Sequence, residues 1–199
     1  IIIATDSHEI KAHCESFGAK VIITSKDCLT GTDRVAEVSE KIKKKQYINL
    51  QGDEPIFPVA ELTKFIKEVT KDPSNIYTAV KKITTEKEYL NLSIPKMVFS
   101  KSKKLLYSSR ANIPANKTNT FNKSYKHVCV YAFNESHLKI FKDQKNKTFF
   151  EKEEDLEINR FLELDQTVIC IELQHSGKAL DTISDFDYIK NFIKKKESK

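Results

Sequence analysis

Short apolar segments alternate with helical patterns in the first part of the chain. Residues 1–4 form an unbroken apolar run. Asp6 and Glu9 then have capping-box spacing, and Gly18 stands where a helix would end, so a helix is expected between them. The β-branched residues 20–24 predict the next short strand.

The same alternation continues up to residue 80. The pattern predicts helices at residues 33–44 and 59–70 and strands at residues 47–50 and 76–80. Alternating elements of this length are typical of βαβ units, in which helices cover both faces of a parallel sheet. We therefore expect an α/β fold whose sheet is mixed but mostly parallel, with helices on both faces.

The pattern becomes looser after residue 80, where strands in an antiparallel or mixed arrangement are expected. Residues 111–125 are polar and have no period, so we interpret them as a mobile loop, either a lid or a disordered segment. No repeat or linker divides the chain, so residues 1–199 are expected to form a single domain. The remaining elements are strands at residues 97–99, 105–107, 128–133 and 168–173, and helices at residues 135–141, at 153–164 and from Ser184 onward.

The sequence QGDEP, residues 51–55, directly follows the strand expected at residues 47–50. Ligands of open parallel sheets bind beyond the carboxyl ends of the strands, so Asp53 would point into a ligand crevice. Gly52 allows close approach of the backbone, and Asp53 supplies a hard oxygen ligand. The alternative is a turn in which Asp53 only caps the next helix.

A second carboxylate in a similar context is Asp181, in the sequence LDTISDF. Thr182 and Asp185 have the spacing of a capping box for the last helix, which leaves Asp181 able to face a ligand. Ordinary capping alone would also explain this run. Together, Asp53 and Asp181 would suit one or two Mg²⁺ ions, which take few protein carboxylates and bridge substrate phosphates.

Charge and composition restrict the partners. The formal net charge of +6 comes mainly from lysine, in runs such as residues 43–45 and 194–196. Because arginines do not cluster and few aromatic residues are interleaved, this charge indicates solvated helix ends and no nucleic-acid partner. No apolar run reaches the ~18 residues of a membrane span, so no membrane is expected either. The four cysteines form no CxxC pair, which favours a reducing, cytoplasmic setting over a zinc site or disulfides.

Several motifs occur in the order of one enzyme family. They are ATD at residues 4–6, GTDRVAE at 31–37, QGDEP at 51–55, YSSRANIP at 107–114, KHVCVYAF at 126–133 and LDTISDF at 180–186. With these motifs the chain resembles the 3-deoxy-manno-octulosonate (Kdo) cytidylyltransferases, or CMP-Kdo synthetases, over nearly its whole length. The resemblance implies a Rossmann-like nucleotide-diphosphosugar transferase fold. It also implies a homodimer. The alternating apolar strand at residues 128–133, beside the polar segment at 111–125, is expected to supply part of the two-fold interface.

The resemblance further implies the reaction and its residues. The anomeric hydroxyl of an ulosonic acid sugar would attack the α-phosphate of CTP, pyrophosphate would leave, and the CMP-sugar would serve lipopolysaccharide or capsule biosynthesis. Asp53 and Asp181 would be the catalytic Mg²⁺ ligands. The sugar would be bound by Arg110, His127, Tyr131 and Glu157, and the nucleotide by Thr5, Asp6, Gly31, Thr32, Arg34, Gln51 and Gly52.

Single residues also have structural interpretations. Arg34 could pair with a nearby carboxylate, His127 could be an ordinary strand residue, and Glu157 could pair with Arg160 on a helix surface. Only their joint order favours a site.

Two features differ from the family pattern. Ile158 stands where the family usually has Gln and Cys129 where it usually has Gly, which leaves the choice between Kdo and a close relative open. The family's opening strand and phosphate loop, roughly PARxxSxRxPxKP, are absent from the sequence. We therefore expect an N-terminally truncated chain that turns over negligibly by itself. The alternative is a non-catalytic, nucleotide-binding or dimer-forming homologue, although the retained acidic positions favour the enzyme.

Overall fold

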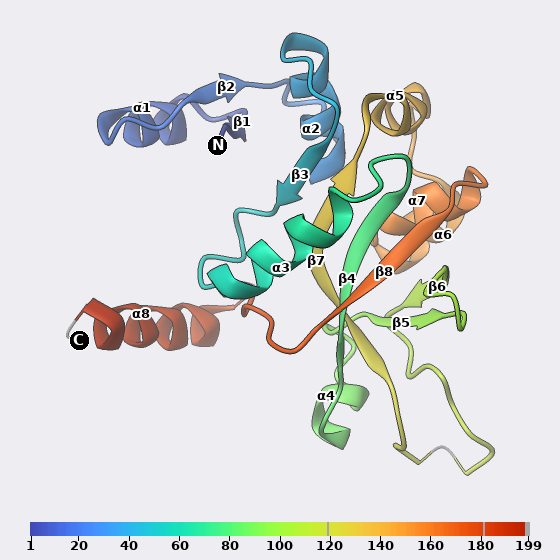
Figure 1. Cartoon of the computed structure of the whole chain (residues 1–199). Helices are drawn as coiled ribbons and strands as arrows, with labels where there is room; N and C mark the ends of the chain where they lie inside the picture. Colours follow the sequence, from blue (N-terminus) through green and yellow to red (C-terminus); the bar gives the residue numbers. More distant parts are fainter. Residues whose placement is uncertain (119, 181, 198–199) are drawn as a thin grey trace.

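A six-stranded sheet with helices on both faces forms the centre of the part of the chain that the structure, a computed structural model, describes (Figure 1). This part comprises residues 1–118, 120–180 and 182–197. The strands are β1 (Ile3–Thr5), β2 (Val21–Ile23), β3 (Tyr47–Leu50), β4 (Ile76–Lys82), β5 (Lys96–Phe99), β6 (Leu105–Ser109), β7 (Tyr125–Phe133) and β8 (Val168–Leu173). The helices are α1 (His8–Ser16), α2 (Gly31–Lys41), α3 (Val59–Val69), α4 (Glu86–Leu90), α5 (Glu135–Asp143), α6 (Phe149–Glu154), α7 (Ile158–Glu163) and α8 (Ile183–Glu197).

β7 lies at the centre of the sheet and sets its pairing. It runs antiparallel to β3, β4 and β5. β8 extends the sheet beyond β4 in the parallel sense, β6 extends it beyond β5, and β1 and β2 form a separate parallel pair. The α/β class and the mixed sheet are thus confirmed. The expectation of a mostly parallel sheet is wrong for the described pairings, because β7 lies between β3 and β4 and runs antiparallel to both.

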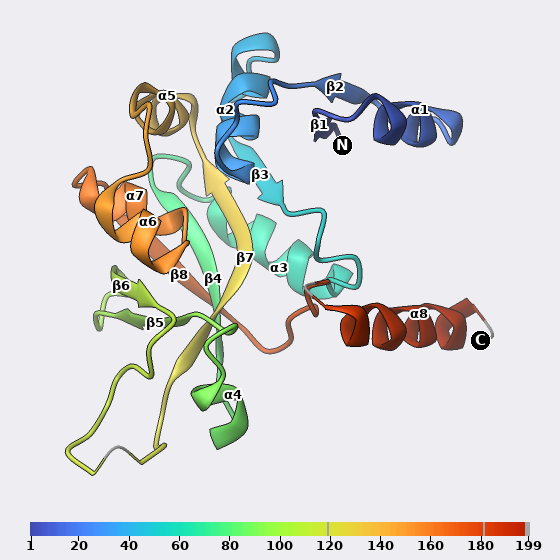
Figure 2. The same ribbon diagram turned by 180° about the vertical axis from the view of Figure 1, so that it is seen from behind.

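The side chains of β7 alternate between two apolar cores. Tyr131 and Phe133 pack on the face that α2, α5 and α7 cover, whereas Val130 packs on the other face against Phe65 and Val69 of α3. α3 lies in front of the sheet in Figure 1, and α6 and α7 lie in front of it in the reverse view of Figure 2. Residues 128–133 are therefore largely buried within one chain, which leaves few of their side chains for the expected two-fold interface.

The first helix begins one residue later than the expected capping box. Ser7 is the N-cap of α1, and its side chain accepts a hydrogen bond from the Ile10 amide at 3.2 Å. The Asp6 carboxylate accepts a hydrogen bond from Arg34 instead, at 2.9 Å. The expected end is confirmed, because Gly18 follows the helix with a φ of 85°, the conformation that glycine adopts most readily.

The helix expected at residues 153–164 is two helices, α6 and α7. Asp155 ends α6 in the left-handed conformation, with φ and ψ both 50°, which Asp tolerates better than most residues. The break buries Leu156 in the core and places Glu157 at the start of α7. The short helix α4 was not expected; Thr85 caps it by accepting a hydrogen bond from the amide of Glu88 at 3.2 Å.

The remaining segments follow the pattern more closely. The described residues between β6 and β7 form no helix or strand, as expected for a loop. The capping box before α8 is confirmed, since Thr182 Oγ1 accepts from the Asp185 amide at 3.3 Å and Asp185 Oδ2 accepts from the Thr182 amide at 2.9 Å. α8 and α1 extend away from the sheet in both views (Figures 1 and 2). A helix long and apolar enough to cross a membrane does not occur in the described residues.

Candidate active site

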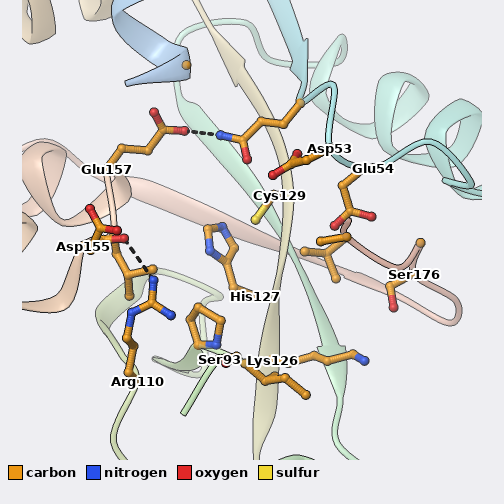
Figure 3. Close-up of a pocket in the computed structure, with 18 of the residues that line it drawn as sticks. Asp53, Glu54, Ser93, Arg110, Lys126, His127, Cys129, Asp155, Glu157 and Ser176 are labelled. Carbon is orange, nitrogen blue, oxygen red and sulfur yellow. Dashed lines mark hydrogen bonds between the residues drawn. The ribbon is translucent and has the colours of Figure 1, made fainter. Parts of the chain in front are cut away.

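A cleft of 730 Å³ opens beside the carboxyl end of β3. Its walls come from the start of α2, the middle of β7, the junction of α6 and α7, the loop after β6 and residues 176–179. In Figure 3, His127 and Cys129 of β7 lie between Asp53 and Glu54 on one side and Arg110 and Asp155 on the other. The predicted site residues in its lining are Gly31, Gln51, Asp53, Arg110, His127, Tyr131 and Glu157.

Glu157 connects the two predicted substrate sides. Its Oε1 accepts a hydrogen bond from Gln51 Nε2 at 2.7 Å, the dashed line at Glu157 in Figure 3. Its Oε2 accepts one from the Thr32 amide at 2.9 Å. Both donors belong to the motifs assigned to the nucleotide. Burial raises the pKa of the Glu157 carboxyl, and the Thr32 amide opposes this shift by binding the charged form. The carboxylate is thus held in one orientation in the cleft wall.

Arg160 does not form a helix-surface pair with Glu157. Its side chain is 0% exposed, and Nε and Nη2 each donate to one oxygen of Glu151 at 2.6 Å. Nη1 donates to Asp33 Oδ1 at 3.0 Å, and the guanidinium lies 3.8 Å from the centre of the Phe141 ring. Arg160 therefore ties α7 to both α6 and the first turn of α2.

Arg110 lies at the end of β6 and has donors available for a ligand. Its Nε donates to the Glu154 carbonyl at 2.6 Å, Nη2 to the Asp155 carbonyl at 3.3 Å and Nη1 to the Leu92 carbonyl at 3.4 Å. A guanidinium has five N–H groups, so about two remain for a ligand. The buried Lys96 ammonium donates to the Arg110 carbonyl at 3.1 Å, and burial lowers its pKa. This cationic end of the cleft suits a carboxylate.

His127 and Tyr131 form the floor of the cleft from β7. Their ring centroids are 5.5 Å apart, and His127 Nε2 shares a hydrogen bond of 2.9 Å with Thr78 Oγ1. His127 Nδ1 is buried without a hydrogen-bond partner among the described residues. Burial lowers the pKa of His127 to about 4 and raises the pKa of Tyr131 well above its usual value. Both side chains are therefore neutral at pH 7, and either can hydrogen-bond a sugar hydroxyl.

The acidic side of the cleft is formed by Asp53 and Glu54 of the QGDEP turn. The Leu180 amide donates to the Asp53 carbonyl at 2.8 Å, which ties the segment before α8 to this turn. Gly177 lies so close to Glu54 that a Cβ at position 177 would collide with the carboxylate. Asp181, the second predicted metal ligand, lies outside the described residues.

Asp53 offers the cleft a hard oxygen donor of the kind that Mg²⁺ prefers. The described residues contain no group of three or more His, Cys, Asp or Glu side chains that could hold a metal. Mg²⁺ does not require such a group, because it usually takes one or two carboxylates and completes its coordination with water and substrate phosphates. The carboxylate of Asp53, in a cleft open to a ligand, fits that requirement.

Comparison with known proteins identifies the family. The cytidylyltransferase family profile matches residues 1–168. The chain belongs to this family. It is 32% identical over 206 residues to the 3-deoxy-manno-octulosonate cytidylyltransferase of Protochlamydia amoebophila, covering 100% of this chain and 79% of that protein. It is 31% identical to the mitochondrial enzyme of the same name from Arabidopsis thaliana, covering 98% of this chain and 69% of that protein.

Solved structures agree with this cytidylyltransferase assignment. The chain superposes with a TM-score of 0.89 on a CMP:2-keto-3-deoxy-manno-octonic acid synthetase complexed with CTP, at 28% identity, covering 98% of this chain and 80% of the other. An inositol-1-phosphate CTP transferase from T. maritima shares the fold, with a TM-score of 0.63 at 10% identity over 92% of this chain and 70% of the other. The family and the nucleotidyltransferase fold expected from the motifs are confirmed.

Some predicted nucleotide residues of this cytidylyltransferase lie outside the lining of the cleft. Arg34 donates to Asp6 at 2.9 Å and to Thr24 Oγ1 at 2.8 Å, which corresponds to the structural interpretation of Arg34. Arg34 also holds the pKa of Asp6 below its usual value. The side chain of Thr32 is buried, and its amide reaches Glu157. The predicted nucleotide-binding residues that do not line the cleft are Thr5, Asp6, Thr32, Arg34 and Gly52.

Three lysines in the lining of the cleft were not among the predicted site residues. Lys126 pairs with Glu88 at 2.8 Å, and Lys147 pairs with Asp155 at 2.8 Å. Lys178 pairs with a carboxylate of the α8 cap. Lys126 opens the motif KHVCVYAF, so its place beside His127 was a usable signal, whereas nothing in the local pattern separates Lys147 and Lys178 from solvated lysines.

Proposed function

We propose that this protein, expressed from its complete reading frame, transfers the CMP group of CTP to the anomeric hydroxyl of Kdo or a close relative and releases pyrophosphate. The observation that carries the proposal is the single cleft that joins Gln51 and Asp53 of the QGDEP turn to Arg110, His127 and Glu157. The closely similar CMP:2-keto-3-deoxy-manno-octonic acid synthetase with bound CTP supports the assignment of both substrates.

Each part of the cleft suits one part of the substrates. The remaining N–H donors of Arg110 suit the sugar carboxylate, with a second cation, Lys126, in the same cleft. The fixed carboxylate of Glu157 accepts hydrogen bonds from sugar hydroxyls, and neutral His127 orients them without adding charge. These contacts hold the sugar so that its anomeric oxygen lies in line with the α-phosphate.

We propose that Asp53 and Asp181 hold Mg²⁺ when the substrates are bound. The metal would neutralise the triphosphate and stabilise the attacking oxygen. The argument for Asp53 is its carboxylate in the cleft wall at the end of β3. We further propose that the protein acts as a cytoplasmic homodimer.

The test is an assay of pyrophosphate release from CTP by the protein expressed from its complete reading frame, with Mg²⁺ and Kdo present. Release that requires both CTP and Kdo is expected, and UTP serves as the control nucleotide. Calorimetric binding of CTP without any release would instead identify a non-catalytic, nucleotide-binding homologue. Absence of both binding and release would refute the proposal.

A further inference from the structure

Two acidic side chains, the buried Glu151 and the partly buried Asp33, share the buried Arg160. Arg160 uses Nε and both Nη atoms on Glu151 and Asp33, at distances of 2.6 Å to Glu151 and 3.0 Å to Asp33. Asp33 in turn accepts a hydrogen bond from Thr30 Oγ1 at 2.9 Å. Thr30 is the N-cap of α2 and lines the cleft. The ion pairs therefore connect α7 with the turn that begins α2.

The same turn carries one of the two donors that hold Glu157. Thr32 lies one residue before Asp33, and its amide donates to Glu157 Oε2 at 2.9 Å. Arg160 is also one helical turn after Glu157, on α7. Arg160 thus fixes both the helix that carries the carboxylate and the backbone amide that orients it.

Stability alone explains this arrangement poorly. Burying Arg160 with the Glu151 carboxylate costs desolvation energy, and well-packed apolar residues often replace such ion pairs without loss of stability. What the planar guanidinium adds is fixed geometry, since two of its N–H groups donate to the two oxygens of one carboxylate. The side chain of Arg160 is 0% exposed, so it contacts no substrate itself.

We propose that Arg160 is a positioning residue for the sugar: through Asp33 it holds the α2 turn against Glu157 and so fixes the carboxylate that reads the sugar hydroxyls. This inference rests on the proposed function of Glu157 in sugar binding. It predicts that replacing Arg160 weakens sugar binding more than CTP binding. This holds although Asp33 belongs to the motif GTDRVAE, which the resemblance assigns to the nucleotide.

Arg160→Lys is the main test, because lysine keeps the charge and loses the fork. We expect the KM for Kdo to rise about tenfold, the scale of one lost hydrogen bond to a charged group, and the KM for CTP to change less than about twofold. In a double-mutant cycle, the effect of Arg160→Lys on the Kdo KM should vanish when Glu157→Gln is already present. Phe65→Leu, which weakens the opposite core under α3, is the matched control for lost stability.

A second measurement needs no substrate. The pKa of Glu157, followed by carbon NMR of the labelled carboxyl, should rise in Arg160→Lys, because the Thr32 amide no longer favours the charged form. It should not rise in Phe65→Leu. If Arg160→Lys does not fold, Asp33→Asn replaces it in the kinetic arm, with the same expected rise in the Kdo KM.

The outcomes separate the two proposals. An inactive wild-type protein refutes the proposed function, and with it the effect on the sugar. An active wild type with equal changes in both KM values, or an unchanged pKa of Glu157 in folded Arg160→Lys, overturns the positioning role alone. An equal rise of the Kdo KM in Phe65→Leu would show a loss of stability and would also overturn it.

Discussion

Burial of His127 should make the protein less stable in weak acid. The imidazole is 8% exposed and has a pKa lowered from 6.5 to about 4 by burial, so the folded state resists protonation. The unfolded chain takes up the proton between these two values. The unfolded state therefore binds more protons in that window, and the stability falls as the pH falls through it.

The size of the effect follows from the two pKa values. Full stability is present above pH 6.5, and about 1.4 kcal/mol is lost for each unit below it until the pH reaches about 4. Between pH 7.5 and pH 5 the His127 contribution to the loss amounts to about 2 kcal/mol. His127→Gln removes the titrating group and keeps an amide that can hydrogen-bond Thr78.

Urea denaturation at pH 7.5 and pH 5 measures this difference in the wild type and in His127→Gln. Other titrating groups, including His137 with its lowered pKa, contribute to both proteins and cancel in the comparison. We expect the wild type to lose about 2 kcal/mol more than the variant over this interval. Equal losses in the two proteins would show that the His127 imidazole is not shielded from water, and the argument for a neutral His127 in the cleft would fail.

Two sets of substitutions test the metal site and the left-handed end of α6. Asp53→Asn should lower the rate of pyrophosphate release by about two orders of magnitude or more, as should Asp181→Asn, and the double variant should be little worse than either. The control is Asp187→Asn, at an exposed position of α8, which should leave the rate unchanged. A near-normal rate of pyrophosphate release by Asp53→Asn would show that Asp53 is not a metal ligand. Asp155→Val should lower the free energy of unfolding by about 1–2 kcal/mol, measured by heat or urea, because a β-branched residue is strained at a φ of 50°. Asp155→Gly should keep this free energy within about 1 kcal/mol of the wild type. Equal values for the two variants would contradict the left-handed conformation.

The apolar pattern predicted most helices and strands because each has one buried face. α3 buries Phe65 and Val69 four residues apart, which the 3.6-residue period shows directly. The direction of β7 was not predictable in this way, since an apolar strand looks the same in a parallel and an antiparallel pair. The break at Asp155 was missed for a related reason: residues on both sides of it keep helical periodicity, and the left-handed cap is an Asp where a Gly would have signalled it.

The candidate site was likewise predictable only in part from the sequence. QGDEP could be placed in a cleft because it follows a strand, and Gln51 and Asp53 are found there. Arg110, His127 and Glu157 are far apart in sequence, and only the family order of motifs suggested that they belong together. The burial of Arg160 had no local signal, because an arginine on a short charged helix normally faces solvent.

The central place of β7 also sets the order in which parts of the protein open. Its amides have partners on both edges, with β3 and β4, whereas β1 and β2 pair over three residues each. Hydrogen exchange in the second half of β7 should therefore require nearly global unfolding, while α1, the β1–β2 pair and α8 exchange through smaller openings. Since Tyr131 lies in this half of β7, the part of the cleft floor that it forms should persist in partly open states that have already lost the outlying segments.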